Sequence, residues 1–285
     1  MCDLLCALPP ATAAGRTLFA KNSDRPPAER QELVWLPPRR DHGPVRATHV
    51  EVAPAGGATI GVLGTRPAWA WGLEQGVNEA GVAAGNATVD TTLDPRGAPP
   101  GLIGMDLVRL ALERAATAKA GVEVLTALLE RHGQGGSGHE GRDRPYWSSF
   151  LLADPAEAWV VDTSGRAWAA VPAGPTRALS NRTTIPDFDR DHRHPRQPVE
   201  RLVDPRLAAG RRVLDRGRLT PSDLMAHLAS HEGGDGGWTV CMHVDGEERT
   251  AAALVAELAP EPVTWWALGS PCATPWRRLP VGPPG

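Results

Sequence analysis

The residue with the clearest chemical potential in this 285-residue chain is a cysteine at position 2. A small residue after the initiator methionine favours removal of that methionine, which would leave Cys2 with a free α-amine. The amine has a reference pKa of about 8 and the thiol one of about 8.5, so the amine can accept the thiol proton near neutral pH. The position therefore predicts a nucleophile and its base on one residue. The alternative is a small apolar residue in a buried strand.

A second cluster, FAKNSDRP, follows at residues 19–26. If the first two strand-like segments form a hairpin, this cluster lies beside Cys2. Lys21 would then supply a cation that favours the thiolate, and Asp24 could accept a hydrogen bond from the α-amine and orient it. The alternative is a polar turn with a solvated lysine and aspartate.

Two asparagines end strand-like segments, Asn86 in AAGNAT and Asn181 in ALSNRT. An asparagine amide can donate to the oxyanion that develops when an amide carbonyl is attacked. Each asparagine taken singly is equally compatible with an ordinary turn.

The remaining histidines and cysteines give weaker patterns. His192 and His194 could bind a metal together with Asp191, but a solvated charged loop explains DFDRDHRHPRQP (187–198) better. The four cysteines show neither a C-x-x-C pair nor a zinc-finger spacing, so we interpret them as free thiols. We expect no metal and no organic cofactor.

The periodicity of apolar residues divides the chain into strands and helices. Two helix pairs are predicted, at 104–115 with 120–133 and at 200–217 with 220–231, with Gly133 as a stop and Thr220 as an N-cap. Strands are predicted at 3–8, 16–21, 32–37, 48–54, 59–64, 148–154, 156–163, 166–171, 176–181, 238–244, 250–258 and 263–269, and one further short strand is predicted between the glycines and asparagines of 76–88.

This order of elements predicts an α+β fold in which helical layers cover two antiparallel sheets. We find no linker, so residues 1–278 are expected to form a single domain and residues 279–285 a frayed tail.

Composition excludes several classes of protein. The chain is 41% hydrophobic and 22% charged, with a net charge of −3, which gives no basic patch for nucleic acid or an anionic membrane. No apolar stretch reaches membrane-spanning length and no secretory signal is evident, so a cytoplasmic location is expected.

Several long motifs occur together and in order: MCDLLCALPPATAAGRTLFAKNSDRP, RPAWAWGLEQGVNEAGVAAGNA, LIGMDLVRLALERAATA, LLERHGQGG and SFLLADPAEAWVVDTSGRAWAA. On these motifs the chain resembles the secernins and the C69 dipeptidases, within the N-terminal-nucleophile (Ntn) hydrolases of the choloylglycine-hydrolase-like superfamily. The resemblance covers most of residues 1–185 and returns near 238–276.

The resemblance implies a four-layer αββα sandwich of the Ntn-hydrolase type and Cys2 as the nucleophile. It places Lys21 at a cationic position, Asp24 where the amine is held, and Asn86 and Asn181 around the oxyanion. It also adds three candidates for substrate binding: Trp69, Trp71 and Arg249.

The function expected from the resemblance is a cysteine amidohydrolase, most simply a dipeptidase. Its expected partner is a small peptide or N-acyl amide substrate, and a homo-oligomer is allowed. Two alternatives share the same residues: an acylase acting on a non-peptide amide, and a catalytically silent secernin-like binding protein. A metal-dependent hydrolase using the histidine-rich segment would be inhibited by chelators.

Overall fold

The computed structural model describes residues 1–40 and 43–283 and shows two large antiparallel sheets packed face to face. The first sheet has the order β12-β1-β2-β14-β15-β16, with the short β13 paired to β14. Its strands are β12 (Thr176–Leu179), β1 (Cys2–Ala7), β2 (Thr17–Arg25), β14 (Glu248–Leu258), β15 (Val263–Ala267), β16 (Arg277–Pro280) and β13 (His243–Val244). The first two segments of the chain form the predicted antiparallel pair.

The second sheet has the order β11-β10-β9-β8-β7-β6-β3. Its strands are β11 (Ala167–Pro172), β10 (Ala158–Ser164), β9 (Trp147–Ala153), β8 (Ala83–Val89), β7 (Gln75–Asn78), β6 (Val62–Pro67) and β3 (Gln31–Leu36). A separate two-stranded ribbon consists of β4 (Val45–Arg46) and β5 (Glu51–Val52), much shorter than the strand predicted at 48–54.

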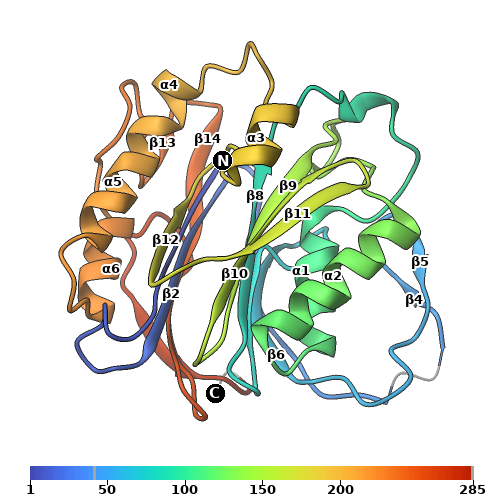
Figure 1. Cartoon of the computed structure of the whole chain (residues 1–285), viewed down its shortest axis with the longest axis horizontal. Helices are drawn as coiled ribbons and strands as arrows, with labels where there is room; N and C mark the ends of the chain where they lie inside the picture. The colour runs from blue at the N-terminus through green and yellow to red at the C-terminus, as the bar shows by residue number, and fades with distance from the viewer. Residues whose placement is uncertain (41–42, 284–285) are drawn as a thin grey trace.

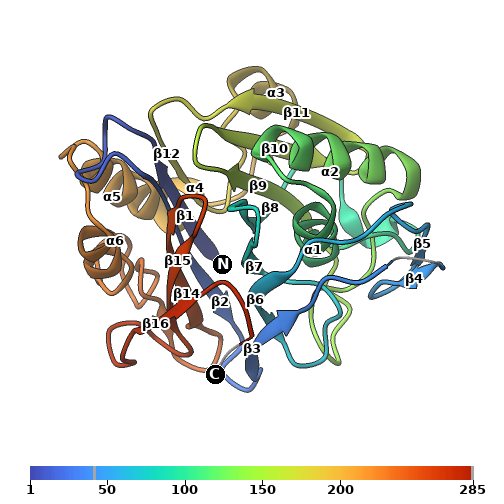
Figure 2. The same cartoon turned by 90° about the horizontal axis from the view of Figure 1, so that it is seen from below.

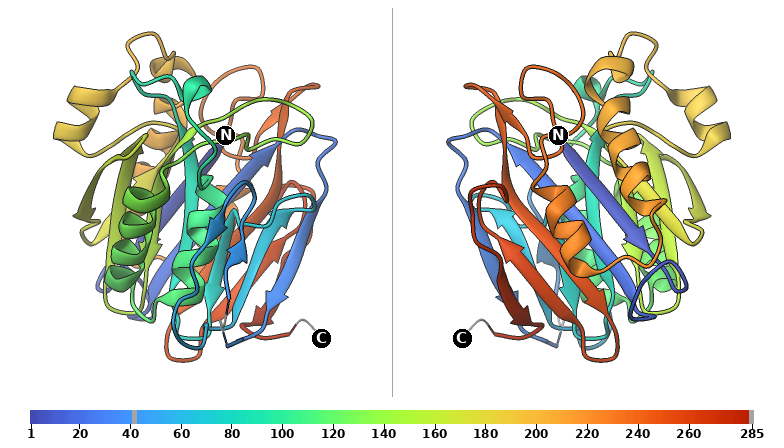
Figure 3. Two further views of the ribbon diagram at one scale, coloured as in Figure 1. Left: turned by 90° about the vertical axis from the view of Figure 1, so that its right-hand side faces the viewer. Right: turned by 90° about the vertical axis from the view of Figure 1, so that its left-hand side faces the viewer.

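Helices cover the outer face of each sheet, which completes the predicted αββα sandwich (Figures 1 and 2). Helices α1 (Gly104–Arg114) and α2 (Ala118–His132) pack on the second sheet, as the left view of Figure 3 shows in green. Helices α5 (Asp204–Leu214) and α6 (Pro221–Leu228) pack on the first sheet, as the right view shows in orange. The predicted caps are present: Thr220 accepts from the Asp223 backbone, and Gly133 ends α2 with φ 71°.

Strand β1 shows how the sequence divides the core. Its side chains alternate, so Cys2, Leu4 and Cys6 point into the core between the two sheets, whereas Leu5 and Ala7 point toward the α5–α6 layer. Cys6 is fully buried, and burial raises the pKa of its thiol to about 12. Cys6 is therefore the deep core residue that its spacing from Cys2 indicates.

The segment predicted to be a loop at 187–198 instead begins with a helix, α3 (Pro186–His192), and the short α4 (Val199–Leu202) follows it. Pro186 occupies the first helical turn, where its missing N–H is not needed. Phe188 is buried and its ring lies 4.2 Å from that of His192. One buried aromatic therefore anchors a helix whose other residues in DFDRDH are all polar or charged.

Two other boundaries differ from the predictions. Only His243 and Val244 of the strand predicted at 238–244 are in a strand, because residues 238–242 follow the glycine-rich turn after α6. At the C-terminus the tail begins later than predicted, since Leu279 and Pro280 pair with β15. Residues 284–285 lie outside the described part of the chain. None of the described helices has the length and apolarity needed to cross a membrane.

Candidate active site

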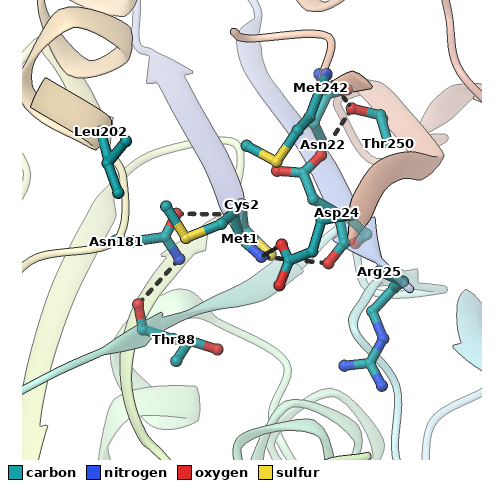
Figure 4. A network of polar contacts seen from close by, with 12 residues as sticks. Met1, Cys2, Asn22, Asp24, Arg25, Thr88, Asn181, Leu202, Met242 and Thr250 are labelled. Atoms are coloured by element: carbon teal, nitrogen blue, oxygen red, sulfur yellow. Dashed lines mark hydrogen bonds and ion pairs between the residues drawn. The ribbon is translucent and has the colours of Figure 1, made fainter. Parts of the chain in front are cut away.

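Cys2 is the first residue of β1 and lies at one end of the core between the two sheets (Figure 4). Its backbone N–H donates to Asn181 Oδ1 at 2.9 Å. Its thiol lies 3.4 Å from Lys21 Nζ, on the neighbouring strand β2. The hairpin thus brings the predicted nucleophile and the predicted cation together, although they are nineteen positions apart.

Lys21 is completely buried, and its ammonium also donates to Ser23 Oγ at 2.6 Å and to the Asn22 carbonyl at 3.4 Å. Its stem crosses to the facing sheet at Gly85, where an added Cβ would come within 2.5 Å of Lys21 Cδ. A buried ammonium needs partners of this kind. Gly85, directly before Asn86, provides the space for it.

Burial and the neighbouring charges shift the pKa of the Cys2 thiol in opposite directions. Burial raises the pKa of the Cys2 thiol, and the charges of Lys21 and the N-terminal amine lower it without cancelling that effect. Lys21 therefore acts in the predicted direction, but the cation alone does not produce a thiolate. A nearby base has to take the proton.

The N-terminal ammonium of Met1 is held by Glu248 Oε2 at 2.6 Å and by the Asp24 carbonyl at 3.3 Å. Burial opposes ionisation of Glu248, but the amine's charge and hydrogen bond outweigh it and lower the pKa of this carboxyl. Glu248 has no counterpart among the sequence predictions, because nothing in EERTAAA marks it as distinct from other acidic residues.

Asp24 follows Lys21 on β2 and accepts a hydrogen bond from Thr250 Oγ1 at 2.6 Å through Oδ1. Its backbone N–H donates to the Met1 carbonyl at 3.0 Å. Asp24 Oδ2 is buried and has no hydrogen-bond partner among the described residues. Burial raises the pKa of Asp24 to about 7. Thr250 lies at a bulge in the pairing of β14 with β2, a device that re-aims side chains near functional sites.

Asn181 stands just beyond β12 and is fixed from both sides. Its amide nitrogen donates to the Thr88 carbonyl at 2.9 Å, and its oxygen accepts from Cys2 N and from Arg206 Nη2 at 3.0 Å. Arg206 is almost completely buried and also forms an ion pair of 2.7 Å with Asp3. Arg206 was not predicted, since an arginine within an amphipathic helix normally faces solvent.

Asn86 comes from the facing sheet, on β8. Its amide nitrogen donates to Ser148 Oγ at 3.4 Å, and its side chain also hydrogen-bonds the Tyr146 side chain. The start of α1 approaches closely, because a Cβ on Gly104 would lie 2.4 Å from Asn86 Nδ2. The Asn86 amide therefore lies next to the N-terminus of α1 and lines the same cavity as Cys2.

These residues surround a cavity of about 110 Å³. Its lining is mainly polar and charged: Met1, Cys2, Asp24, Arg25, Glu74, Asn86, Thr88, Asp90, Met105, His139, Arg144, Pro145, Tyr146, Asn181, Gln197 and Glu248. The cavity brings together four of the five predicted catalytic residues, and the fifth, Lys21, lies behind the thiol of Cys2.

His139 is another lining residue that the sequence analysis did not select. Burial, together with the charges of Arg25 and Arg144, lowers the pKa of His139 to about 3, so its imidazole is neutral. Its Nδ1 is buried without a hydrogen-bond partner among the described residues.

The three predicted substrate-binding residues do not line this cavity. Trp69 packs on a small cluster that contains Met105, a lining residue, and so stands one layer behind the wall. Trp71 packs against the α1 layer, with the guanidinium of Arg109 3.8 Å from its ring centroid. Arg249 is exposed, since its neighbour Glu248 takes the inward position on β14.

The sequence profile of peptidase family C69 matches residues 55–202, just over half of the chain. The chain belongs to peptidase family C69. This C69 protein is therefore an amide-bond hydrolase by family, and the matched region contains β8 with Asn86, α1 and the segment that ends with Asn181.

Solved structures show the same fold at low sequence identity. A C2A mutant of conjugated bile acid hydrolase from Clostridium perfringens superposes with a TM-score of 0.60 at 12% identity, covering 100% of this chain and 94% of that one. Penicillin V acylase from Agrobacterium tumefaciens gives 0.59 at 13%, covering 98% and 86%. The Caenorhabditis elegans ortholog of N-acylethanolamine-hydrolyzing acid amidase gives 0.53 at 13%, covering 89% and 91%. The sandwich is thus the Ntn-hydrolase fold.

Proposed function

We propose that this C69 protein is a cysteine dipeptidase whose nucleophile is Cys2 after removal of Met1. The observation that carries the proposal is the charged pocket at the N-terminus, where Glu248 binds an α-ammonium at 2.6 Å beside the Cys2 thiol. A cytoplasmic location and a small-molecule substrate, with neither nucleic acid nor a membrane as partner, go with this function.

Removal of Met1 converts Cys2 N from an amide into an amine next to Asn181 Oδ1 and the cavity. With a reference pKa of about 8, that amine can take the thiol proton that burial would otherwise hold in place. Lys21 then stabilises the thiolate from 3.4 Å. The unpartnered Oδ2 of Asp24 lies in the same cavity and is available to accept from the amine.

The thiolate attacks the amide carbonyl, and the negative charge that develops on oxygen is stabilised by amide donors. Asn86 is one such donor, since its amide lines the cavity and can exchange its contacts with Ser148 and Tyr146 for the oxyanion. Asn181 uses one N–H on Thr88 and retains a second, while its oxygen holds Cys2 N in place. The protonated amine passes its proton to the leaving group, and water then releases the acyl group with the amine again serving as base.

The pocket favours a dipeptide over a lipophilic amide. An apolar acyl chain needs apolar walls, whereas four carboxyl side chains and two guanidinium groups surround this small cavity. Without Met1, the Glu248 carboxylate loses the ammonium that lies 2.6 Å from it and keeps Arg144 at 3.8 Å, so a substrate ammonium can replace the one that is lost. Arg144 is exposed and is the guanidinium that a substrate carboxylate can reach, because Arg25 is already paired with Glu29 and Glu74.

Intact mass of the purified protein, measured before and after treatment with a thiol-reactive electrophile, tests the nucleophile. We expect loss of Met1 and one rapidly labelled site that is missing in Cys2→Ala. Retained methionine, or labelling spread evenly over the cysteines, would contradict the mechanism and favour a binding protein.

Substrate class is tested by comparing dipeptides with their N-acetyl forms and with N-acyl amides that lack a peptide. A dipeptidase cleaves the free dipeptides and loses at least about tenfold in kcat/KM when the ammonium is acetylated. Preference for the N-acyl amides would make the protein an acylase instead.

A further inference from the structure

A second cluster of cysteine and histidine side chains lies at the β13 edge of the first sheet, outside the cavity described above. His231 follows α6, Cys241 and His243 flank Met242 at β13, and Cys272 lies in the turn after β15. The ligand atoms of these four side chains all lie within 4.8 Å of one another. We refer to these four residues as the Cys₂His₂ cluster.

The contacts within the cluster are close. His243 Nε2 lies 3.2 Å from Cys272 Sγ and 3.4 Å from Cys241 Sγ. The His231 and His243 rings meet edge to face, with centroids 5.1 Å apart. Two sulfur and two nitrogen ligands thus point to one centre.

We propose that the Cys₂His₂ cluster binds a structural zinc ion. Zn²⁺ prefers four tetrahedral thiolate and imidazole ligands, with Zn–S of about 2.3 Å and Zn–N of about 2.0–2.1 Å. Those bond lengths separate neighbouring ligand atoms by about 3.4–3.8 Å. His243 Nε2 lies 3.2 and 3.4 Å from the two sulfurs, and all four ligand atoms lie within 4.8 Å of one another, so small side-chain shifts would complete the tetrahedron. All four positions are filled by protein, which is typical of structural rather than catalytic zinc.

The backbone around the cluster is already fixed. The Cys241 N–H donates to the Ser230 carbonyl at 2.8 Å, and the His243 N–H donates to the Gly237 carbonyl at 3.0 Å. Ser270, near Cys272, donates from Oγ to the Thr250 carbonyl at 2.9 Å. Sequence spacing does not reveal the site because the strands β14 and β15 separate Cys272 from the other three residues.

The cluster is linked to the cavity through Thr250. The backbone of Met242, which stands between two ligands, donates to Thr250 Oγ1 at 2.8 Å and accepts from Thr250 N at 3.0 Å. The same hydroxyl donates to Asp24. A zinc ion would therefore hold the segment that positions Asp24, and this consequence, unlike zinc binding itself, rests on the proposed function.

The test uses the full chain purified without a histidine tag, incubated with Zn²⁺, desalted and analysed for metal by mass spectrometry. We expect close to one zinc ion per chain in the wild type. The zinc content per chain should fall by roughly tenfold or more in Cys272→Ser and in His231→Ala. His194→Ala, which removes a histidine from outside the cluster, is the matched control and should keep its zinc, as should Cys2→Ala.

Replacement of the zinc by Co²⁺ should give the visible absorption of a tetrahedral site with thiolate ligands. Absence of zinc after reconstitution, or a mass two hydrogens lower that shows a Cys241–Cys272 disulfide, would overturn the proposal. Because neither readout uses activity, failure of the zinc site and failure of the peptidase mechanism can be told apart.

Discussion

The first sheet carries two cysteine sites in which burial raises the pKa of a thiol but the neighbouring side chains differ. At the start of β1, one thiol faces a buried ammonium, carboxyl groups and an open cavity. At the β13 edge, two thiols face two imidazoles and one another. The first arrangement provides a cation, a base and room for a substrate, whereas the second provides a complete set of metal ligands.

The comparison shows that neighbours, rather than residue type, decide what a cysteine does. Cys6 is a third example, because it lies on the same strand as Cys2 but is enclosed in the core. Burial there raises the pKa of its thiol to about 12. One strand thus holds a candidate nucleophile and an inert thiol four residues apart.

The largest expected effect separates the two sites by activity. Cys2→Ala should reduce kcat/KM by roughly 10⁴-fold or more, because it removes the nucleophile. Cys272→Ser should reduce it by about tenfold or less, through Thr250 and Asp24. Steady-state kinetics on one dipeptide measures both, with thermal unfolding as the control for folding. Equal losses of kcat/KM in the two variants would contradict the distinction between a catalytic cysteine and a metal-binding cysteine.

A smaller effect is expected from two neighbours on β14 that face opposite ways. Glu248→Gln removes the charge that binds an α-ammonium and should raise KM for dipeptides by about ten- to a hundredfold, the range for a hydrogen-bonded charge pair. Arg249→Ala is the matched control, and because Arg249 is exposed it should change KM by less than about twofold. A larger effect at Arg249 would place the substrate on the outer face of β14.

The layers of the fold were predictable because apolar residues recur along helices and strands with the periods typical of these elements. Leu4 and Leu5 alternate between two cores, and the α1 and α2 segments repeat apolar residues on one face, so local pattern and final packing agree. The predicted hairpin placed Lys21 beside Cys2 because β1 and β2 are consecutive strands, joined by residues 8–16, and pair antiparallel.

The parts that could not be predicted depend on contacts between distant segments. Glu248 reaches Met1 across 247 positions, and Arg206 reaches Asp3 across 203. Register in a sheet decides which face a residue takes, and one position separates inward Glu248 from outward Arg249. No local pattern distinguishes those two residues, and none brings Cys272 to His231.

The smallest predicted effect concerns the pH dependence of stability at Asp24, a buried carboxyl of the Cys2 site. Burial raises the pKa of Asp24 from 3.8 to about 7, so the folded state binds the proton more tightly than the unfolded chain. The stabilising contribution of this group is fully present below about pH 4 and is lost as pH rises through about 7.

The Asp24→Asn variant keeps the shape of the side chain and can still accept a hydrogen bond from Thr250, but it cannot ionise. Its Tm should therefore rise relative to the wild type between pH 4 and pH 8, by roughly 2–4 °C for each kcal/mol. Asp94→Asn removes an exposed carboxyl whose pKa is lowered by its hydrogen bonds with Arg96, and it should show no such rise. A Tm difference for Asp24→Asn that stays constant over this range would mean that Asp24 is ionised throughout, paired with the N-terminal amine.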